Sequence, residues 1–71
     1  MGGLKKRSVV LAGHATSLAL EPEFWETLDR MARGEDLSLA ALIARIDTTR
    51  GERALASACR LAALAFAVAG H

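Results

Sequence analysis

The sequence lacks the covalent features that commonly stabilise a very small protein. It contains a single cysteine among 71 residues, which excludes an internal disulfide. Its cysteine, histidine and carboxylate residues do not cluster with the spacing of a structural metal site. A domain of this size rarely gains more than a few kcal/mol from its core without such support. We therefore expect the chain to be stabilised by association with another copy of itself.

The composition supports the same expectation and lacks a strong excess of either charge. Hydrophobic residues make up 52% of the sequence, which is more than a small monomer can bury. The formal net charge is only +1. Nucleic-acid-binding domains commonly have a large excess of basic residues. The net charge alone therefore does not indicate such a function.

Signals for export and membrane insertion are also missing. Residues 8–12 follow a short basic run but are too short for the apolar region of a signal peptide. The stretch over residues 54–69 is very apolar, yet it is shorter than the roughly 20 residues of a membrane span. It also contains Arg60. We expect a cytoplasmic protein that has no membrane partner.

Motifs for catalysis are absent as well. The sequence contains no glycine-rich phosphate loop and no nucleophile elbow. Cys59 lies on an apolar helical stripe, where a thiol behaves as a small core residue. We expect no enzyme activity, no cofactor and no bound metal ion.

The clearest pattern in the sequence is a short alternating segment at residues 15–20, directly before a helix start. Alternation places neighbouring side chains on opposite faces of a strand. The inward face is predicted to hold Thr16, Leu18 and Leu20, and the outward face Ala15, Ser17 and Ala19. A strand this short is not stable alone. We expect it to pair with its own copy in a second chain, forming an intermolecular antiparallel β-ribbon.

The segment before this strand allows two interpretations. Val9, Val10 and Leu11 have strand propensity, and Gly13-His14 interrupts them. Residues 8–12 are either the start of one long bent strand or the first arm of a hairpin with its turn at residues 13–15. The pairing of this segment, within the chain or across a dimer, is left open. Residues 1–7 are predicted to be a flexible basic tail, and residues 8–71 one domain.

Three helices are predicted after the strand. The first covers about residues 22–33, because Pro22 suits the first helical position and Gly34 suits the end. The second covers about residues 38–49, with Ser38 as its N-cap. The third covers about residues 53–69 and is apolar nearly all round, so it must be covered on most sides. The predicted core of a homodimer consists of Thr16, Leu18, Leu20, Phe24, Trp25, Leu28, Leu42, Ile43 and Ile46.

Several short stretches between residues 6 and 64 together form a family pattern. They are residues 6–9, 13–21, 23–25, 37–39, 46–47 and 50–51, followed by the Ala-Ser-Ala-Cys-Arg-Leu helix at residues 56–61. Gly13-His14, Thr16-Ser17 and Phe24-Trp25 are the most specific parts. The pattern resembles a family of small bacterial ribbon-helix-helix domain proteins within the Arc-like ribbon-helix-helix superfamily.

The resemblance implies a mainly α-helical fold with a short N-terminal β-strand. Two chains would pair their strands into an antiparallel ribbon over intertwined helices, and the third helix is an addition to the minimal unit. It also implies a DNA-binding transcriptional regulator, whose ribbon enters the major groove and whose second helix holds a phosphate at its N-terminus. The DNA-contacting residues that the resemblance implies are Ala15, Ser17, Ala19, Ser38 and Leu39. The basic residues Lys5, Lys6 and Arg7 precede the ribbon, so we expect them to reach phosphates and to add salt-dependent affinity.

The outward residues also favour a second interpretation. Ala15, Ser17 and Ala19 are short, so they cannot make the bidentate contacts that discriminate guanine or adenine. The alternative is a non-enzymatic protein–protein interaction module, or an antitoxin-like protein, that uses the same dimeric fold without strong DNA binding. A third possibility is a larger oligomer assembled through the third helix.

Overall fold

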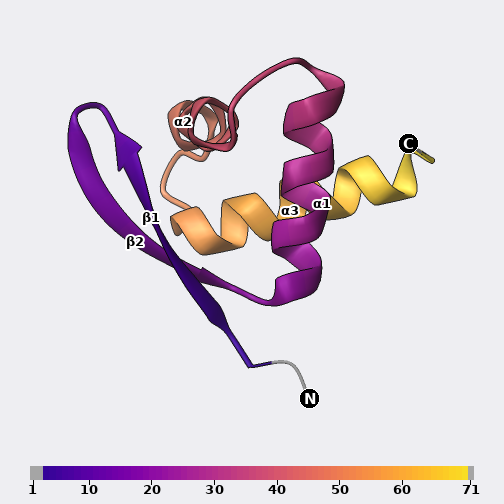
Figure 1. Ribbon diagram of the computed structural model, residues 1–71, viewed down its shortest axis with the longest axis horizontal. Helices are drawn as coiled ribbons and strands as arrows, with labels where there is room; N and C mark the ends of the chain where they lie inside the picture. The colour runs from indigo at the N-terminus through magenta and orange to yellow at the C-terminus, as the bar shows by residue number, and fades with distance from the viewer. Residues whose placement is uncertain (1–2, 71) are drawn as a thin grey trace.

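A β-hairpin followed by three helices forms the chain (Figure 1). The computed structural model describes residues 3–70, and Met1, Gly2 and His71 lie outside the described part. The elements are β1 (Lys5–Leu11), β2 (His14–Leu20), α1 (Pro22–Gly34), α2 (Leu39–Thr49) and α3 (Leu55–Val68). This order confirms the predicted strand and three helices, with boundaries that shift by one or two residues.

The two strands pair antiparallel within the same chain, from Lys5 opposite Leu20 to Leu11 opposite His14. Ala12 and Gly13 connect them with φ angles of 53° and 81°. Positive φ at both positions is the requirement of the common two-residue hairpin loop. Glycine adopts this conformation freely, whereas alanine is strained in it. The hairpin alternative is therefore confirmed, and its turn lies one residue earlier than the predicted turn at residues 13–15.

The prediction of a flexible N-terminal tail is wrong for its last three residues. Lys5, Lys6 and Arg7 belong to β1 and not to a flexible tail, because their backbones pair with the last residues of β2. The alternating segment also has a partner in its own chain, since β1 occupies one edge of β2. The other edge of β2 has no neighbour in this two-stranded sheet. Pairing of that edge with a second chain stays a prediction.

Helix α1 begins at Pro22 and buries Trp25, Leu28, Met31 and Ala32. Of the two aromatic residues predicted in the core, Trp25 is buried and Phe24 is half-buried. The indole Nε1 of Trp25 donates a hydrogen bond of 2.7 Å to the Lys5 carbonyl. This bond satisfies the polar atom of the ring, so that the large side chain can be buried.

The end of α1 differs from the prediction that Gly34 stops the helix. Gly34 is still helical, and Asp36 adopts the left-handed conformation with φ of 60°. The Leu37 amide donates to the Ala32 carbonyl at 2.8 Å, and the Asp36 amide donates to the Arg33 carbonyl at 3.2 Å. These two bonds are those of a Schellman motif. They satisfy carbonyls at the helix end and redirect the chain toward α2.

Helix α2 begins as predicted. The Ser38 hydroxyl accepts a hydrogen bond of 3.0 Å from the Ala41 amide, which confirms Ser38 as the N-cap. The helix ends at Thr49, and Gly51 follows with φ of 64°. After this break α3 starts at Leu55, two residues later than predicted.

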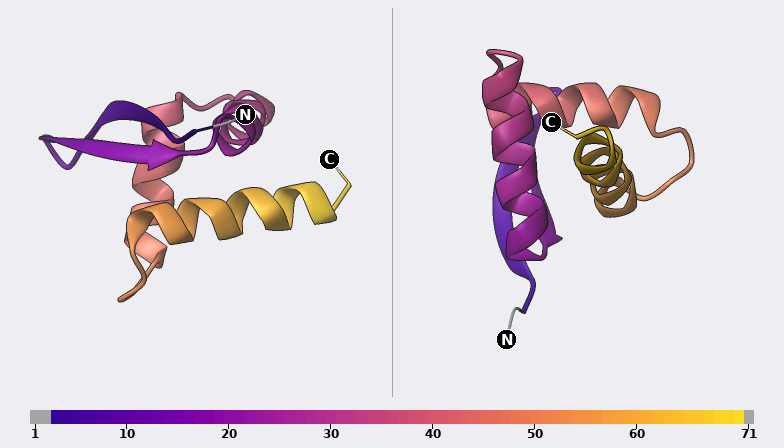
Figure 2. Two further views of the ribbon diagram at one scale, coloured as in Figure 1. Left: turned by 90° about the horizontal axis from the view of Figure 1, so that it is seen from below. Right: turned by 90° about the vertical axis from the view of Figure 1, so that its right-hand side faces the viewer.

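The elements form two layers joined by α2. The hairpin and α1 lie side by side in one layer, α3 crosses behind them, and α2 runs from the first layer to the second (Figure 2). The side chains fully buried between the layers are Leu20, Leu28, Leu42, Ile43 and Cys59. No helix in the described residues is long and apolar enough to span a membrane.

Most of the predicted core is buried within a single chain. Leu18, Leu20, Trp25, Leu28, Leu42, Ile43 and Ile46 are all buried, whereas Thr16 and Phe24 are half-buried. The hairpin adds Val9 and Leu11 to this core, and α3 adds Ala58, Cys59 and Ala63. The sharing of these residues between two chains stays a prediction.

Candidate nucleic-acid interface

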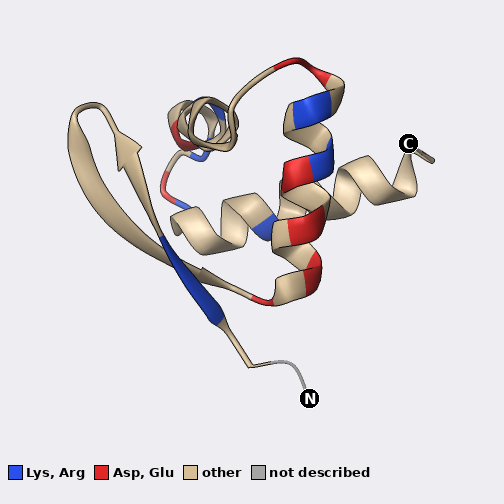
Figure 3. Cartoon of the chain, viewed as in Figure 1, with Lys and Arg blue, Asp and Glu red and all other residues tan. Residues whose placement is uncertain are grey.

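The face of the hairpin that points away from the helices is the candidate interface. Residues directly opposite in an antiparallel pair lie on the same face. The register therefore groups Lys6 with Ala19, Ser8 with Ser17, and Val10 with Ala15. We call these six residues the outer hairpin face. Neither strand contains an acidic residue, as Figure 3 also shows.

The predicted outward residues of β2 lie as expected. Ala15 and Ser17 are exposed and Ala19 is half-buried. Ser8 and Val10 lie opposite Ser17 and Ala15 on the outer hairpin face but were not predicted there. The pairing of β1 with β2 is needed to place these two residues on the same face as Ser17 and Ala15. Alternation alone could have grouped Lys6, Ser8 and Val10 once residues 5–11 were recognised as one strand.

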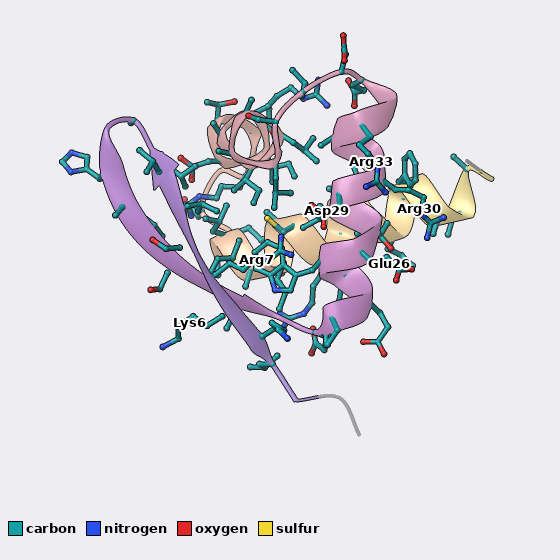
Figure 4. The ribbon with its side chains drawn as sticks, viewed as in Figure 1. Lys6, Arg7, Glu26, Asp29, Arg30 and Arg33 are labelled. Atoms are coloured by element: carbon teal, nitrogen blue, oxygen red, sulfur yellow. The ribbon has the colours of Figure 1, made fainter. Side chains whose placement is uncertain are left out.

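The pleat of β1 divides the basic run at residues 5–7 between two faces. Lys6 lies on the outer hairpin face, whereas Lys5 and Arg7 pair with Leu20 and Leu18 on the face toward the helices. Figure 4 shows Arg7 pointing toward α1 and Lys6 pointing away from it. Of the three predicted basic contacts, only Lys6 therefore shares a face with Ala15, Ser17 and Ala19.

Arg7 makes two contacts within its own chain. Its guanidinium carbon lies 4.9 Å from the centre of the Trp25 ring, which is a cation–π distance. Its Nη1 atom lies 3.7 Å from Oδ1 of Asp29. The Trp25–Lys5 hydrogen bond adds a third link between β1 and α1. These contacts fix the start of β1 against α1, so that the orientation of Lys6 is defined by the fold.

The start of α2 lies on the same side of the molecule as the hairpin. Helix α2 begins beside the hairpin and α1 and then runs away from them (Figure 2). Ser38 is exposed and Leu39 is half-buried. The structure thus brings the predicted phosphate anchor and the predicted ribbon to one side, although the Ser38 hydroxyl is already used as the helix cap.

Glu35, shortly before the start of α2, forms an ion pair with Arg45 of the helix. The Arg45 guanidinium donates to both carboxylate oxygens of Glu35, at 2.8 and 2.6 Å. This hydrogen bonding lowers the pKa of Glu35 and raises the pKa of Arg45. Because the negative charge of Glu35 is matched by Arg45, it opposes the approach of an anion less than an unpaired carboxylate would.

The remaining reactive side chains are the possible metal ligands and the Cys59 thiol. Within residues 3–70, no three histidine, cysteine, aspartate or glutamate side chains lie close enough together to hold a metal ion. Burial raises the pKa of the Cys59 thiol to about 11. The thiol is therefore protonated at neutral pH and fully buried, which is the state of a core residue and not of a nucleophile.

Comparison with known proteins agrees with this arrangement. No curated protein matches the chain. A solved structure of an uncharacterized protein from Bordetella pertussis Tohama I is similar, with a TM-score of 0.78 and 27% sequence identity. The similarity covers 93% of this chain but 57% of that protein, so this chain spans little more than half of its length. The family model of the ribbon-helix-helix domain matches residues 4–67. The chain belongs to the ribbon-helix-helix domain family.

Proposed function

We propose that this chain is a DNA-binding transcriptional regulator, which acts in the cytoplasm as a homodimer. The observation that carries the proposal is the outer hairpin face, which is free of acidic residues and presents Lys6 among short side chains. The major groove of DNA is wide enough for a two-stranded β-ribbon. Short side chains would let the ribbon approach the base edges closely.

The chemistry of the outer hairpin face suits the major groove. The Ser8 and Ser17 hydroxyls can donate or accept hydrogen bonds at base edges, and Ala15 can contact a thymine methyl group. Lys6 can contact a backbone phosphate, which adds affinity without sequence preference. The α2 N-terminus at Ser38 and Leu39, on the same side, can hold a second phosphate through backbone amides.

The acidic residues constrain how a duplex would approach. Glu23 and Glu26 are exposed on the first half of α1, and like charges repel the phosphates. We therefore expect the duplex to contact the hairpin and the start of α2 while it avoids this half of α1. With one outward lysine per chain, the dependence of affinity on salt should be moderate.

Replacement of Lys6 by glutamine tests the proposal. We expect the slope of log affinity against log salt concentration to become less steep by about 2 for a dimer, because each lost phosphate contact removes about 0.9. Arg30→Gln is the matched control, since Arg30 is an exposed cation on α1 beside Glu26. The assay is fluorescence anisotropy on duplex DNA. An unchanged slope for the Lys6 variant would contradict a role of the outer hairpin face.

A second candidate is a non-enzymatic protein–protein interaction module or an antitoxin-like protein. It is favoured by the absence of long polar side chains, other than Lys6, on the outer hairpin face. The formal net charge of +1 also fits it. The two candidates separate in one experiment, because only the DNA-binding regulator should bind random duplex DNA at low salt. Co-purification with a specific protein, together with no DNA binding, would support the second candidate.

A further inference from the structure

Helix α3 is apolar on two opposite faces, and only one of them is covered. The inner face packs into the core through Cys59 and Ala63, which are 0% and 1% exposed. The opposite face carries Leu61, Leu64 and Val68, which are 45%, 55% and 78% exposed. We call these three residues the outer α3 stripe. Three large exposed side chains on one helix face form a patch of the kind that commonly marks an interaction site.

The spacing and charge of the outer α3 stripe restrict its partner. Leu61, Leu64 and Val68 are separated by three and four residues, the spacing of a seam between two packed helices. Residues 61–70 include no charged side chain. The nearest charge, Arg60, is held by Glu21 of the same chain at 2.9 Å. A partner surface therefore needs to be apolar and needs no complementary charge.

A membrane surface does not meet these conditions well. Helices that lie in a lipid interface combine an apolar face with a polar face rich in lysine and arginine. The face of α3 opposite the stripe is buried against the rest of the chain through Cys59 and Ala63. The helix thus offers no basic face for lipid headgroups.

We infer that the outer α3 stripe packs against the same stripe of a second copy of this chain, with the two helices antiparallel. A two-fold interface uses one patch on both partners. An uncharged stripe with a leucine at its centre is complementary to itself in this arrangement, because no charge is desolvated and none is placed opposite a like charge. Leu64, in the middle of the stripe, lies nearest to the two-fold axis.

The size of the stripe indicates what this contact can do. The patch measures on the order of a few hundred Å², so two copies bury less than the roughly 1,200 Å² of a stable interface. The contact is weak alone and adds to other contacts between chains. The stripe lies on the face of α3 opposite its buried residues Cys59 and Ala63, and α3 itself lies in the layer behind the hairpin and α1 (Figure 2). Association through α3 therefore leaves the outer hairpin face uncovered.

Sedimentation velocity over a range of protein concentrations tests the inference. We expect the sedimentation coefficient of the wild type to rise with concentration, and that of Leu64→Glu to stay at the low-concentration value. Thr48→Glu is the matched control, because it adds the same charge at an exposed position on α2. Circular dichroism checks that all three proteins are folded. Equal concentration dependence for the wild type and Leu64→Glu would overturn the inference.

A cross-linking experiment tests the antiparallel geometry independently. Leu64→Cys should form a disulfide between chains under mild oxidation, because the two-fold axis brings this position close to its copy. Thr48→Cys should form far less, and the native Cys59 is buried and does not compete. A stripe that served another protein or a lipid surface would leave the Leu64→Cys yield at the control level, and that result would overturn the inference. DNA binding is measured in a separate assay, so a failure of this inference can be distinguished from a failure of the proposed DNA-binding function.

Discussion

Single side chains in this protein take roles that depend on contacts distant in sequence. Lys6 and Arg7 are neighbours, yet Lys6 lies on the outer hairpin face and Arg7 packs on Trp25 of α1. In the sequence they belong to one basic run, and a short charged run contains no information on which residue meets a tryptophan eighteen positions later. Ser38 was predictable, since an N-cap depends only on residues three positions apart.

The Glu21–Arg60 pair gives a pH-dependent prediction at the residue scale. The hydrogen bond from Arg60 lowers the pKa of Glu21 below its ordinary value of 4.5. A lowered folded-state pKa contributes stability above the unfolded-state pKa, and this stability is lost as pH falls through the folded-state pKa. We expect Arg60→Gln to be less stable than the wild type at pH 7, with the difference shrinking below about pH 4.5.

Urea unfolding at pH 7 and pH 3 measures this effect. Glu21→Gln should lose similar stability at pH 7, because it removes the other partner of the same pair. Titration of Glu21 by NMR in the Arg60→Gln protein should give a pKa closer to 4.5. A stability difference that is independent of pH would show that Arg60 acts through packing on Phe24, whose ring centre is 5.8 Å from its guanidinium carbon.

At the scale of elements, the helices were more predictable than the hairpin. Pro22 and Ser38 mark the helix starts by local rules. The pairing of β1 with β2 could not be decided, because both alternatives for residues 8–12 satisfy the same strand propensities. Ala12 and Asp36 adopt positive φ although neither is glycine. The predictions relied on the nearest glycines, Gly13 and Gly34, and therefore placed the turn and the helix end at slightly wrong positions.

The hairpin turn offers a prediction at this scale. Ala12 has φ of 53°, where alanine is disfavoured by about 1–2 kcal/mol. Asparagine followed by glycine is the preferred sequence of such a loop. We therefore expect Ala12→Asn to stabilise the protein by about 1 kcal/mol, measured by urea unfolding.

The control is the same substitution at a position with ordinary strand geometry. Ala15 is exposed within β2, where asparagine is depleted, so Ala15→Asn should bring no gain. An Ala12→Asn protein that is no more stable than the wild type would argue against strain at this turn.

At the scale of the whole molecule, one core unites the hairpin and all three helices. Helical periodicity correctly predicted four core residues, Leu28, Leu42, Ile43 and Ile46, because it identifies the buried face of a helix directly. Val9 and Leu11 were missed as core residues, since their burial depends on how the hairpin folds onto α2 and α3. Only the β2 residues of the outer hairpin face were predicted, because the β1 residues of that face depend on how β1 pairs with β2.

Leu42 tests the importance of this core. Leu42 is 1% exposed, and a buried charge without a partner is very unfavourable. We expect Leu42→Asp to abolish the folded protein and with it any dimer, measured by circular dichroism and light scattering. The neighbouring Ala41→Asp is the control, because Ala41 is exposed in the first turn of α2, where an acidic residue is favourable. A folded and unchanged Leu42→Asp assembly would refute the core assignment.

The central claim is that the dimer binds DNA through its hairpins. The most direct measurement is fluorescence anisotropy of random-sequence duplex DNA with the purified wild-type protein, at low and at near-physiological salt. We expect binding at low salt that weakens clearly as salt increases, because the contacts to phosphates release counterions. No binding even at low salt would contradict the claim and would favour the protein-interaction function.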